Sequence, residues 1–223
     1  MTQALFIAGT APGVGKTTAA QALVDMLMDA SYDAAYYKPI VSGTDSIPES
    51  DAGRVRAACG LEQDILTLTS YVFKDPVSPH LAAAQMMQPV DPDMIAADFA
   101  SVALLHDATI VEGTGGIICP YTLYADGRTV MQEDVVKNLD LATILVADSG
   151  IGTLNATLLS VDYMRHHDLP LSGIILNRFD AQNPVHQDNL TTIERLGAVD
   201  VVATIADGGA MTLRKSFFLL EME

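Results

Sequence analysis

The sequence predicts an α/β fold in which a mostly parallel β-sheet is flanked by helices. Apolar runs of strand length alternate with amphipathic stretches of helical period, the pattern typical of strand–helix–strand units. A glycine-rich turn at residues 9–17 joins the first such run to the first such helix. The 223 residues, 49% of them hydrophobic, can bury a sizeable core, and their sequence contains no linker or internal repeat. We therefore expect one domain over residues 1–223.

The expected elements are short and follow one another closely. The strands are expected at residues 4–8, 34–37, 109–111, 142–147, 172–176 and 201–205. The helices are expected at residues 17–30, 52–59, 92–105, 153–167 and 185–196. In the first helix Ala20, Leu23, Val24 and Leu27 recur three and four residues apart and form its buried face. Residues 60–89 lack a clear period and contain three prolines, so we expect a covering loop near the functional site.

The turn at residues 9–17 has the composition of a phosphate-binding loop, Gly-Thr-Ala-Pro-Gly-Val-Gly-Lys-Thr. Backbone N–H groups in such a turn cradle anionic oxygens, the lysine reaches the outer phosphates of ATP, and the threonine hydroxyl can ligate Mg²⁺. The residues that would bind nucleotide in this way are Gly13, Val14, Gly15, Lys16, Thr17 and Thr18. Five residues, where four are usual, separate Gly9 from the Gly-Lys-Thr, so the loop is a deviant Walker A motif. An ordinary glycine-rich turn with an incidental lysine is the alternative.

Charged residues follow the next two expected strands, at the sheet edge where parallel α/β folds bind ligands. Lys38, with Ser42 close behind it, could neutralise charge on a transferring phosphoryl group, or could be a surface lysine. Glu112 ends the third expected strand and suits a carboxylate ligand of Mg²⁺. Asp51 begins a helical stretch, where it is either a further magnesium ligand or, as the spacing alone favours, an acid that complements the helix dipole.

Two later strand ends also carry polar residues. Residues 148–155 form a second glycine-rich entry into a helix, whose free N–H groups could hold a carboxylate of a second substrate. An ordinary turn capped by Thr153 is the alternative. Asn177 follows the fifth expected strand, and its amide suits the edge of adenine as well as it suits a plain turn.

Charge and composition exclude several classes of protein. The formal net charge of −16 argues against nucleic acid and anionic membranes as partners. No apolar run approaches the ~20 residues that cross a bilayer, and the N-terminus shows no basic leader, so we expect a cytoplasmic protein. The two cysteines and five histidines show neither metal-ligand spacing nor an arrangement for covalent catalysis.

Together and in this order, the motifs resemble those of the dethiobiotin synthetase family. The matching positions are residues 9–17, 38–43, 78–80, 111–116, 152–155 and 177. The loop keeps the family's five-residue gap, and Thr114 replaces an alanine of the family's Val-Glu-Gly-Ala-Gly-Gly. The resemblance runs from residue 5 to about residue 180.

This resemblance implies an ATP- and Mg²⁺-dependent enzyme that makes dethiobiotin from 7,8-diaminononanoate and CO₂. One amine of the substrate takes up CO₂ as a carbamate, and ATP phosphorylates that carbamate to a mixed anhydride. The second amine then closes a cyclic urea and expels phosphate. Positioning both amines beside the captured CO₂ makes the ring closure effectively unimolecular.

The resemblance also implies a role for each motif. The residues that would act on the carbamate and the phosphoryl group are Lys16, Lys38 and Ser42. Those that would hold Mg²⁺ are Thr17, Asp51 and Glu112, and Asn177 would contact adenine. Contacts to the diamine substrate would come from Pro12, Lys38, Ser42, Pro79, Gly115, Gly152, Thr153 and Asn155. The family is a homodimer, and the last three of these residues would receive the substrate carboxylate across the interface.

The chain departs from the family pattern at both ends. Ala11 and Pro12 stand where the family has Asp and Thr, and Pro12 lacks both a hydroxyl and an N–H, which bears on substrate handling. Ala206 stands in place of a proline that precedes the family's adenine contacts, and residues 216–220 do not match. The nucleotide preference is therefore less closely predicted than the phosphate site.

Three rival interpretations share part of the pattern. A cobyrinic-acid amidating synthetase has the same deviant loop, but it adds a glutamine-hydrolysing domain for which 223 residues leave no room. A nucleotide switch related to partitioning or metallochaperone ATPases would carry an early loop lysine, where this chain has Thr10 and Ala11, or a Cys or His metal motif. A paralogue acting on a different diamine is consistent with Pro12.

Overall fold

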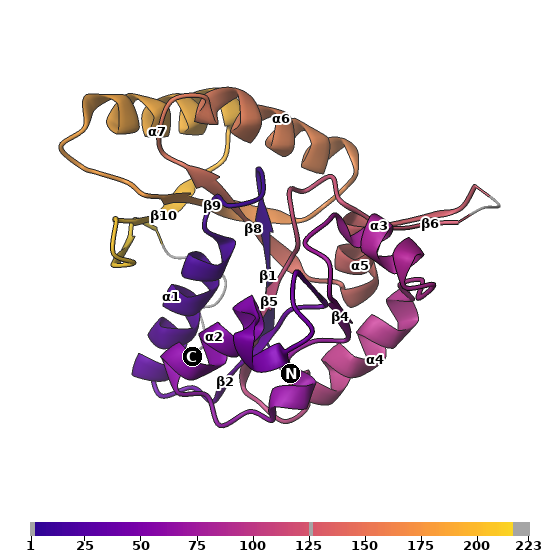
Figure 1. The fold of residues 1–223 in the computed structure, drawn as a ribbon. Helices are drawn as coiled ribbons and strands as arrows, with labels where there is room; N and C mark the ends of the chain where they lie inside the picture. Colours follow the sequence, from indigo (N-terminus) through magenta and orange to yellow (C-terminus); the bar gives the residue numbers. More distant parts are fainter. Residues whose placement is uncertain (1–2, 125–126, 216–223) are drawn as a thin grey trace.

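The computed structural model describes residues 3–124 and 127–215 and confirms the α/β architecture (Figure 1). Its central sheet has seven strands in the order β11-β10-β9-β8-β1-β5-β2. The parallel strands are β1 (Gln3–Gly9), β2 (Ala34–Tyr37), β5 (Ala108–Glu112), β8 (Ala142–Asp148), β9 (Leu171–Asn177) and β10 (Val201–Ile205). β11 (Met211–Leu213) pairs antiparallel with β10 at one edge. All six strands expected from the sequence are present, whereas residues 216–220 lie outside the described residues.

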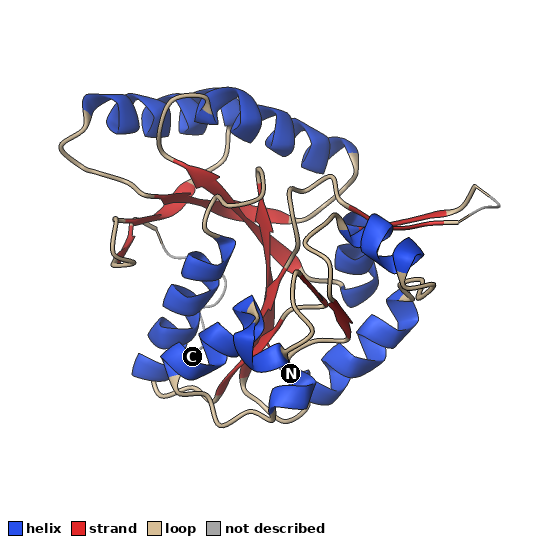
Figure 2. Cartoon of the chain, viewed as in Figure 1, coloured by secondary structure: helices blue, strands red, loops and turns tan. Residues whose placement is uncertain are grey.

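Helices cover both faces of this sheet (Figure 2). Successive side chains of a strand point to opposite faces, so Leu5 and Ile7 of β1 enter one core while Phe6 and Ala8 enter the other. The helices on the Leu5 face are α1 (Lys16–Asp29) and α2 (Asp51–Cys59). Those on the Phe6 face are α4 (Pro92–Ala103), α5 (Gln132–Leu139), α6 (Thr153–His166) and α7 (Pro184–Gly197).

The buried stripe predicted for the first helix is present in α1. Ala20, Leu23, Val24 and Leu27 are all at most 1% exposed and pack on the sheet. Burying one leucine fully contributes about 1.5–3 kcal/mol, so this stripe fixes α1 against β1 and β5. The N-terminus of α1 is thereby held at the carboxyl end of β1, where the phosphate-binding loop was expected.

The expectation of a covering loop at residues 60–89 was wrong in that the segment is not a loop, although β4 lies near the site, where Phe73 pairs with the cavity-lining Ser42. The segment contains a 3₁₀ turn (Ile65–Thr67), β4 (Tyr71–Phe73) and α3 (Pro79–Gln85). β4 pairs in parallel with β3 (Ile40–Ser42). This pairing joins residues far apart in the sequence, so no alternation of apolar and polar residues within the segment predicts it. None of residues 60–89, all of which the structure describes, lines the cavity that contains Lys16.

Several further features have no counterpart among the expected elements. β6 (Pro120–Leu123) and β7 (Thr129–Met131) form an antiparallel pair that extends away from the sheet (Figure 1). α5 follows directly, and its apolar residues Val135, Val136 and Leu139 have a helical spacing that the sequence analysis did not use. A short 3₁₀ turn (Ile47–Glu49) also precedes α2.

Among the described residues, no helix combines the length and the apolar character that a bilayer crossing requires.

Candidate active site

The turn between β1 and α1 has the backbone geometry of a phosphate-binding loop. Gly13 has φ +73° and Gly15 has φ +98°, conformations that side chains other than glycine rarely adopt. Gly15 is also the N-cap of α1, so the first N–H groups of the helix open toward the loop. A Cβ at Gly15 would stand 1.9 Å from the amide nitrogen of Asn177, so this position admits no side chain while Asn177 lies beneath it.

Lys16 points into the space enclosed by this loop. The residue is 7% exposed, and its ammonium group donates to the carbonyl oxygen of Ala11 at 3.2 Å and to that of Gly115. Burial lowers the pKa of Lys16, an effect that nearby Glu112 opposes and nearby Lys38 reinforces. The ammonium is therefore only partly compensated by protein charge, a condition that favours an anionic ligand at this point.

Glu112, at the end of β5, is the centre of a buried hydrogen-bond cluster. The residue is 1% exposed. Its Oε1 accepts from Thr17 Oγ1 at 2.9 Å and from Lys38 Nζ at 2.8 Å, while its Oε2 accepts from the hydroxyl of Tyr36 at 2.7 Å. Burial, and then Glu112 itself, raise the pKa of Tyr36 well above its ordinary value, so the phenol remains a donor.

Lys38 links Glu112 to Asp51. Its Nζ lies 2.8 Å from Glu112 Oε1 and 2.9 Å from Asp51 Oδ2. Burial disfavours the charged lysine, but the two carboxylates outweigh burial and raise the pKa of Lys38. In the same way, Lys38 together with Arg54 outweighs the effect of burial on Asp51 and lowers the pKa of that carboxyl. Asp51 is the first residue of α2, where Ser50 caps the helix and Arg54 forms a second ion pair with the aspartate.

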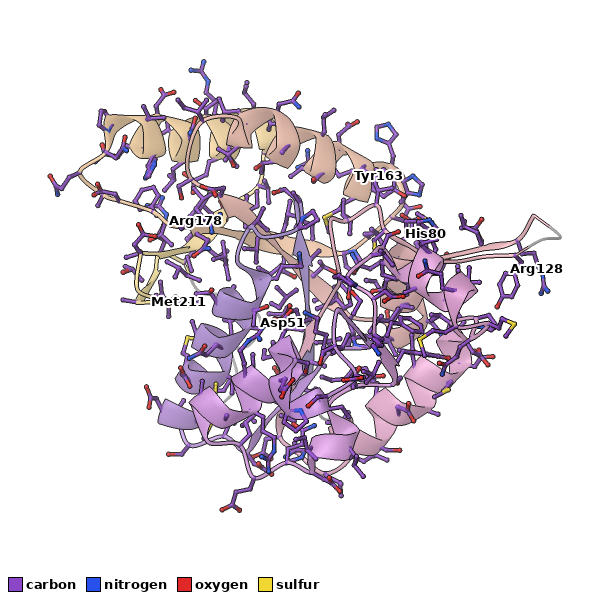
Figure 3. The ribbon with its side chains drawn as sticks, in the orientation of Figure 1. Asp51, His80, Arg128, Tyr163, Arg178 and Met211 are labelled. Carbon is purple, nitrogen blue, oxygen red and sulfur yellow. The ribbon has the colours of Figure 1, made fainter. Side chains whose placement is uncertain are left out.

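These groups share one cavity of about 400 Å³ at the carboxyl ends of β1, β2 and β5. The predicted site residues that line it are Pro12, Gly13, Gly15, Lys16, Thr17, Thr18, Lys38, Ser42, Asp51, Glu112 and Gly115. Four lining residues were not predicted, namely Ile40, Gly113, Thr114 and Arg178. Figure 3 shows Asp51 near the middle of the molecule and Arg178 near the end of β9. The two lysines and two acids that the sequence singled out thus lie together.

Other predicted site residues do not line this cavity. Val14 is buried beneath the loop, and its carbonyl oxygen accepts from the amide nitrogen of Asn177 at 3.0 Å. Asn177 is 4% exposed, and the oxygen of its amide has no protein partner among the described residues. Pro79 is buried at the first position of α3. In the structure, the side chain of Asn177 therefore holds the phosphate-binding loop through its hydrogen bond to Val14.

The second glycine-rich turn, which precedes α6, also lies outside the cavity. The interpretation of Thr153 as a helix cap was wrong, because Gly152 occupies the N-cap position and the Thr153 hydroxyl donates to the carbonyl oxygen of Asp148. Gly152 and Asn155 are exposed, and Ile151 beside them is 97% exposed. This turn presents its helix N-terminus to the surface of its own chain.

Arg178 is a lining residue that sequence reasoning missed. Its guanidinium group donates to the carbonyl oxygen of Gly13 at 3.3 Å and pairs with Asp148. Burial alone would raise the pKa of Asp148, but Arg178 and the backbone N–H groups of the turn outweigh it and lower that pKa. Its position directly after Asn177 at a strand end was the available signal.

The oxygen atoms of the cluster fit a magnesium ion. Mg²⁺ prefers carboxylate, hydroxyl and water oxygens, and Thr17, Asp51 and Glu112 supply the first two kinds. In the described part of the chain, no group of three His, Cys, Asp or Glu residues could by itself hold a metal. A magnesium ion here would therefore complete its shell with phosphate and water oxygens, as is usual for nucleotide-bound magnesium.

Comparison with known proteins places these features in a family. Residues 3–208 match a family described as an AAA domain. The ATP-dependent dethiobiotin synthetase of Brachyspira hyodysenteriae is 36% identical over 208 residues, which are 93% of this chain and 94% of that protein. The corresponding synthetase of Clostridium novyi is 35% identical over 209 residues, covering 92% of this chain and 87% of that protein.

A solved structure supports the fold independently. The ParA family ATPase from Chlorobium tepidum superposes on 92% of this chain and 84% of its own, with a TM-score of 0.55 and 13% sequence identity. At that identity the likeness concerns the fold alone. It therefore does not support the interpretation of this protein as a nucleotide switch related to partitioning ATPases. Full-length similarity, the shared motifs and the P-loop fold agree with one another, and the chain belongs to the dethiobiotin synthetase family.

Proposed function

We propose that this protein is an ATP- and Mg²⁺-dependent dethiobiotin synthetase that acts on 7,8-diaminononanoate and CO₂. Its relatives at 36% and 35% identity carry the name of that synthetase. The structural observation that supports the proposal is the shared cavity of Lys16, Lys38, Asp51 and Glu112 beside the phosphate-binding loop. Such a cavity combines a place for a triphosphate with cations that can stabilise a transferring phosphoryl group.

The proposed reaction has three steps. One amine of the substrate adds to CO₂, loses a proton and becomes a carbamate. A carbamate oxygen then attacks the γ-phosphorus of ATP, so that ADP leaves and a carbamic–phosphoric anhydride forms. The second amine loses a proton as it attacks the carbonyl carbon, the carbon–oxygen bond to the phosphate breaks, and the cyclic urea and inorganic phosphate are released. Because both amines belong to one molecule, ring closure needs mainly orientation from the protein.

The two lysines would divide the charge stabilisation between them. Lys16 lies next to the loop, and its only partly compensated charge suits the outer phosphates of ATP. Lys38 lies between Asp51 and Glu112, and Ser42 lines the same cavity, so both would contact the carbamate. Developing negative charge on the transferred group would then meet the ammonium groups of both lysines.

Magnesium would be held by Thr17, Asp51 and Glu112, whose oxygen atoms already meet through hydrogen bonds and ion pairs with one another or with Lys38. When bound, the ion would neutralise phosphate charge and orient the γ-phosphoryl group. The carbonyl oxygen of the Asn177 amide would accept from the exocyclic amine of adenine, while the amide nitrogen holds Val14.

The diamine chain would extend from Lys38 past Pro12 and Gly115, which line the cavity, with Pro79 placed further along the substrate. Its carboxylate would reach the α6 turn of a second subunit, since the turn is exposed and does not line its own cavity. The residues of that turn are Gly152, Thr153 and Asn155. We accordingly assign the protein to a homodimer with its site at the interface.

We take residues 1–223 to be one domain of a cytoplasmic enzyme whose partners are small molecules. The net charge of −16 supports the exclusion of nucleic acid and anionic membranes from those partners.

The test is a direct assay of the product. Purified protein is incubated with diaminononanoate, bicarbonate, ATP and Mg²⁺, and dethiobiotin is measured by mass spectrometry alongside ADP. Product formation that falls sharply in Lys38→Ala, but not in a variant of the exposed lysine of α5, Lys137→Ala, supports the proposal. ADP without cyclic urea would contradict it and would favour a paralogue with a different diamine, as Pro12 allows. Product formation unchanged in Lys38→Ala would remove Lys38 from the mechanism.

A further inference from the structure

Gln132, the first residue of α5, is fully buried beneath the loop that follows Glu112. Its Oε1 accepts from the backbone N–H of Thr114 at 2.7 Å and from the hydroxyl of Tyr121 at 3.0 Å. Its Nε2 donates to the carbonyl oxygen of Gly116 at 3.0 Å. One uncharged side chain therefore grips the loop at two points, two residues apart.

This pattern of bonds requires a neutral amide. The site presents two donors to one atom of the side chain and an acceptor to the other. A carboxylate could accept the two donors but would face the Gly116 carbonyl without a hydrogen, and a methionine of similar size could do neither. Because Gln132 is 0% exposed, bulk water cannot form the hydrogen bonds that such a substitution would remove.

The loop that Gln132 holds forms one wall of the cavity. Gly113, Thr114 and Gly115 all line the cavity, and the carbonyl oxygen of Gly115 accepts from the ammonium of Lys16. Gly113 is packed so closely that a Cβ there would stand 2.5 Å from Gln132 Oε1 and 2.8 Å from the ring of Phe6. The position of the Lys16 ammonium is therefore tied, through Gly115, to the amide of Gln132.

We propose that Gln132 is a positioning residue for the phosphoryl-transfer step. It fixes the backbone of residues 113–116, and through the Gly115 carbonyl it fixes the ammonium of Lys16. The inference rests on the proposed function for the identity of the reaction, but the coupling of Gln132 to Lys16 can be tested by nucleotide binding alone.

The first test compares Gln132→Met with wild type and with Thr122→Val. Thr122 is a matched control, because it is also buried and its hydroxyl also accepts from a distant backbone N–H, that of Val90 at 2.7 Å, and neither residue lines the cavity. We expect both variants to lose stability, whereas Gln132→Met alone lowers kcat per folded molecule, by about tenfold to a hundredfold, because small displacements of catalytic groups have effects of this size. Hydrogen exchange at residues 113–116 should accelerate in Gln132→Met alone.

The second test uses Gln132→Glu, which preserves shape. Its protonated form can donate to Gly116 and its ionised form cannot, so the activity of this variant relative to wild type should rise as the pH falls from 9 to 6. Burial raises the pKa of Tyr121 well above its ordinary value and that of Cys119 to about 11, so neither neighbour titrates in this range. The charged groups nearest in sequence, Glu133 and its ion-pair partner His167, are the same in wild type and variant.

The outcomes separate this inference from the proposed function. If Gln132→Met has wild-type kcat and loop exchange per folded molecule, or if the activity ratio of Gln132→Glu falls as the pH falls, Gln132 has a structural role only and the inference is wrong. If wild type makes no dethiobiotin, the proposed function fails. The inference then stands or falls on ATP affinity measured by calorimetry, which should weaken in Gln132→Met and not in Thr122→Val.

Discussion

Lys38 and Glu112 form an ion pair in the protein interior, with Nζ and Oε1 2.8 Å apart and side chains only 7% and 1% exposed. Neither charge can be solvated by bulk water, so each depends on the other and on the cluster around them. This dependence couples the stability of the fold to the residues proposed to act on the carbamate. It leads to the first prediction, which concerns the two residues together.

Lys38→Met should destabilise the protein by about 3–5 kcal/mol, since removal of one member of a buried pair leaves an uncompensated charge. The bonds from Thr17 and Tyr36 to Glu112 place the expected value toward the lower end of this range. The double variant Lys38→Met/Glu112→Gln should recover most of the lost stability, yet neither variant should form product. Urea unfolding of the wild type, both single variants and the double variant completes the thermodynamic cycle. Additive losses would show that the pair is not coupled in this way.

Lys16 should behave in the opposite way, although it lies in the same cavity. Its pKa is lowered by burial, so its charge destabilises the folded state relative to the unfolded state. The pKa of Lys38 is instead raised by its two acids. We expect Lys16→Met to unfold at the same urea concentration as wild type or a higher one at pH 7, while losing activity. This is the pattern of a residue kept for function at the expense of stability. A clear loss of stability in Lys16→Met would contradict it.

The same contrast gives a pH dependence of opposite sign for the two lysines. Lys16 has a folded pKa below the unfolded value of 10.5, so the unfolded state binds more protons, and the stability of wild type relative to Lys16→Met should rise as the pH rises toward 10.5. Lys38 has a folded pKa above 10.5, so its contribution is fully present below 10.5 and is lost as the pH rises through the raised value. Urea unfolding between pH 7 and 10.5 measures the first effect directly.

Most of the fold could be predicted because its determinants are local. The apolar run of β1, the glycines that follow it and the periodic stripe of α1 occupy adjacent stretches of sequence, and each has its own recognisable pattern. The missed elements depend on distant partners or are very short. β4 acquires its strand conformation by pairing with β3. α5 has only eight residues and was missed although Val135, Val136 and Leu139 have helical spacing.

Most of the candidate site could also be predicted, because its residues lie in local sequence patterns. Lys38 and Glu112 stand at strand ends, which sequence position alone marks as ligand-facing. Tyr36 and Gln132 were missed because each acts through a partner from another part of the chain, whereas Arg178 was missed although it follows a strand end. Tyr36 lies in a short, wholly buried strand of four residues, where no alternation distinguishes a tyrosine with a polar task from a core residue.

Tyr36 provides the fourth prediction, which concerns magnesium. Its hydroxyl holds Oε2 of Glu112 and so directs Oε1 toward Thr17 and Lys38. Tyr36→Phe should weaken the binding of Mn²⁺, used as a paramagnetic probe for Mg²⁺, by about tenfold to a hundredfold, as losses of groups that orient metal ligands generally do. Electron paramagnetic resonance titration in the presence of ADP measures this affinity without reference to turnover.

A matched control is available elsewhere in the chain. The hydroxyl of Tyr163 donates to the carboxylate of Glu133, in a cluster with His167 that does not line the cavity. Tyr163→Phe should therefore lower stability by an amount similar to that for Tyr36→Phe, about 1.5–3 kcal/mol for a hydrogen bond to a charged group, but should leave Mn²⁺ affinity unchanged. Equal Mn²⁺ affinities in the two variants would show that Tyr36 does not orient the metal ligands.

The last prediction concerns the subunit interface. The turn before α6 does not line the cavity of its own chain, and Ile151 at its tip is 97% exposed, so we expect a substrate that contacts both to bridge two copies. Asn155→Asp places a negative charge where the substrate carboxylate is proposed to bind, and Lys38→Met disables the other half of the site. Each variant alone should be inactive with diaminononanoate. After subunit exchange, an equal mixture should regain up to about a quarter of wild-type activity, because half of the dimers are mixed and each mixed dimer has one complete site. If native mass spectrometry shows mixed dimers but the mixture remains inactive, or if the wild-type protein is monomeric at assay concentration, the substrate does not cross an interface.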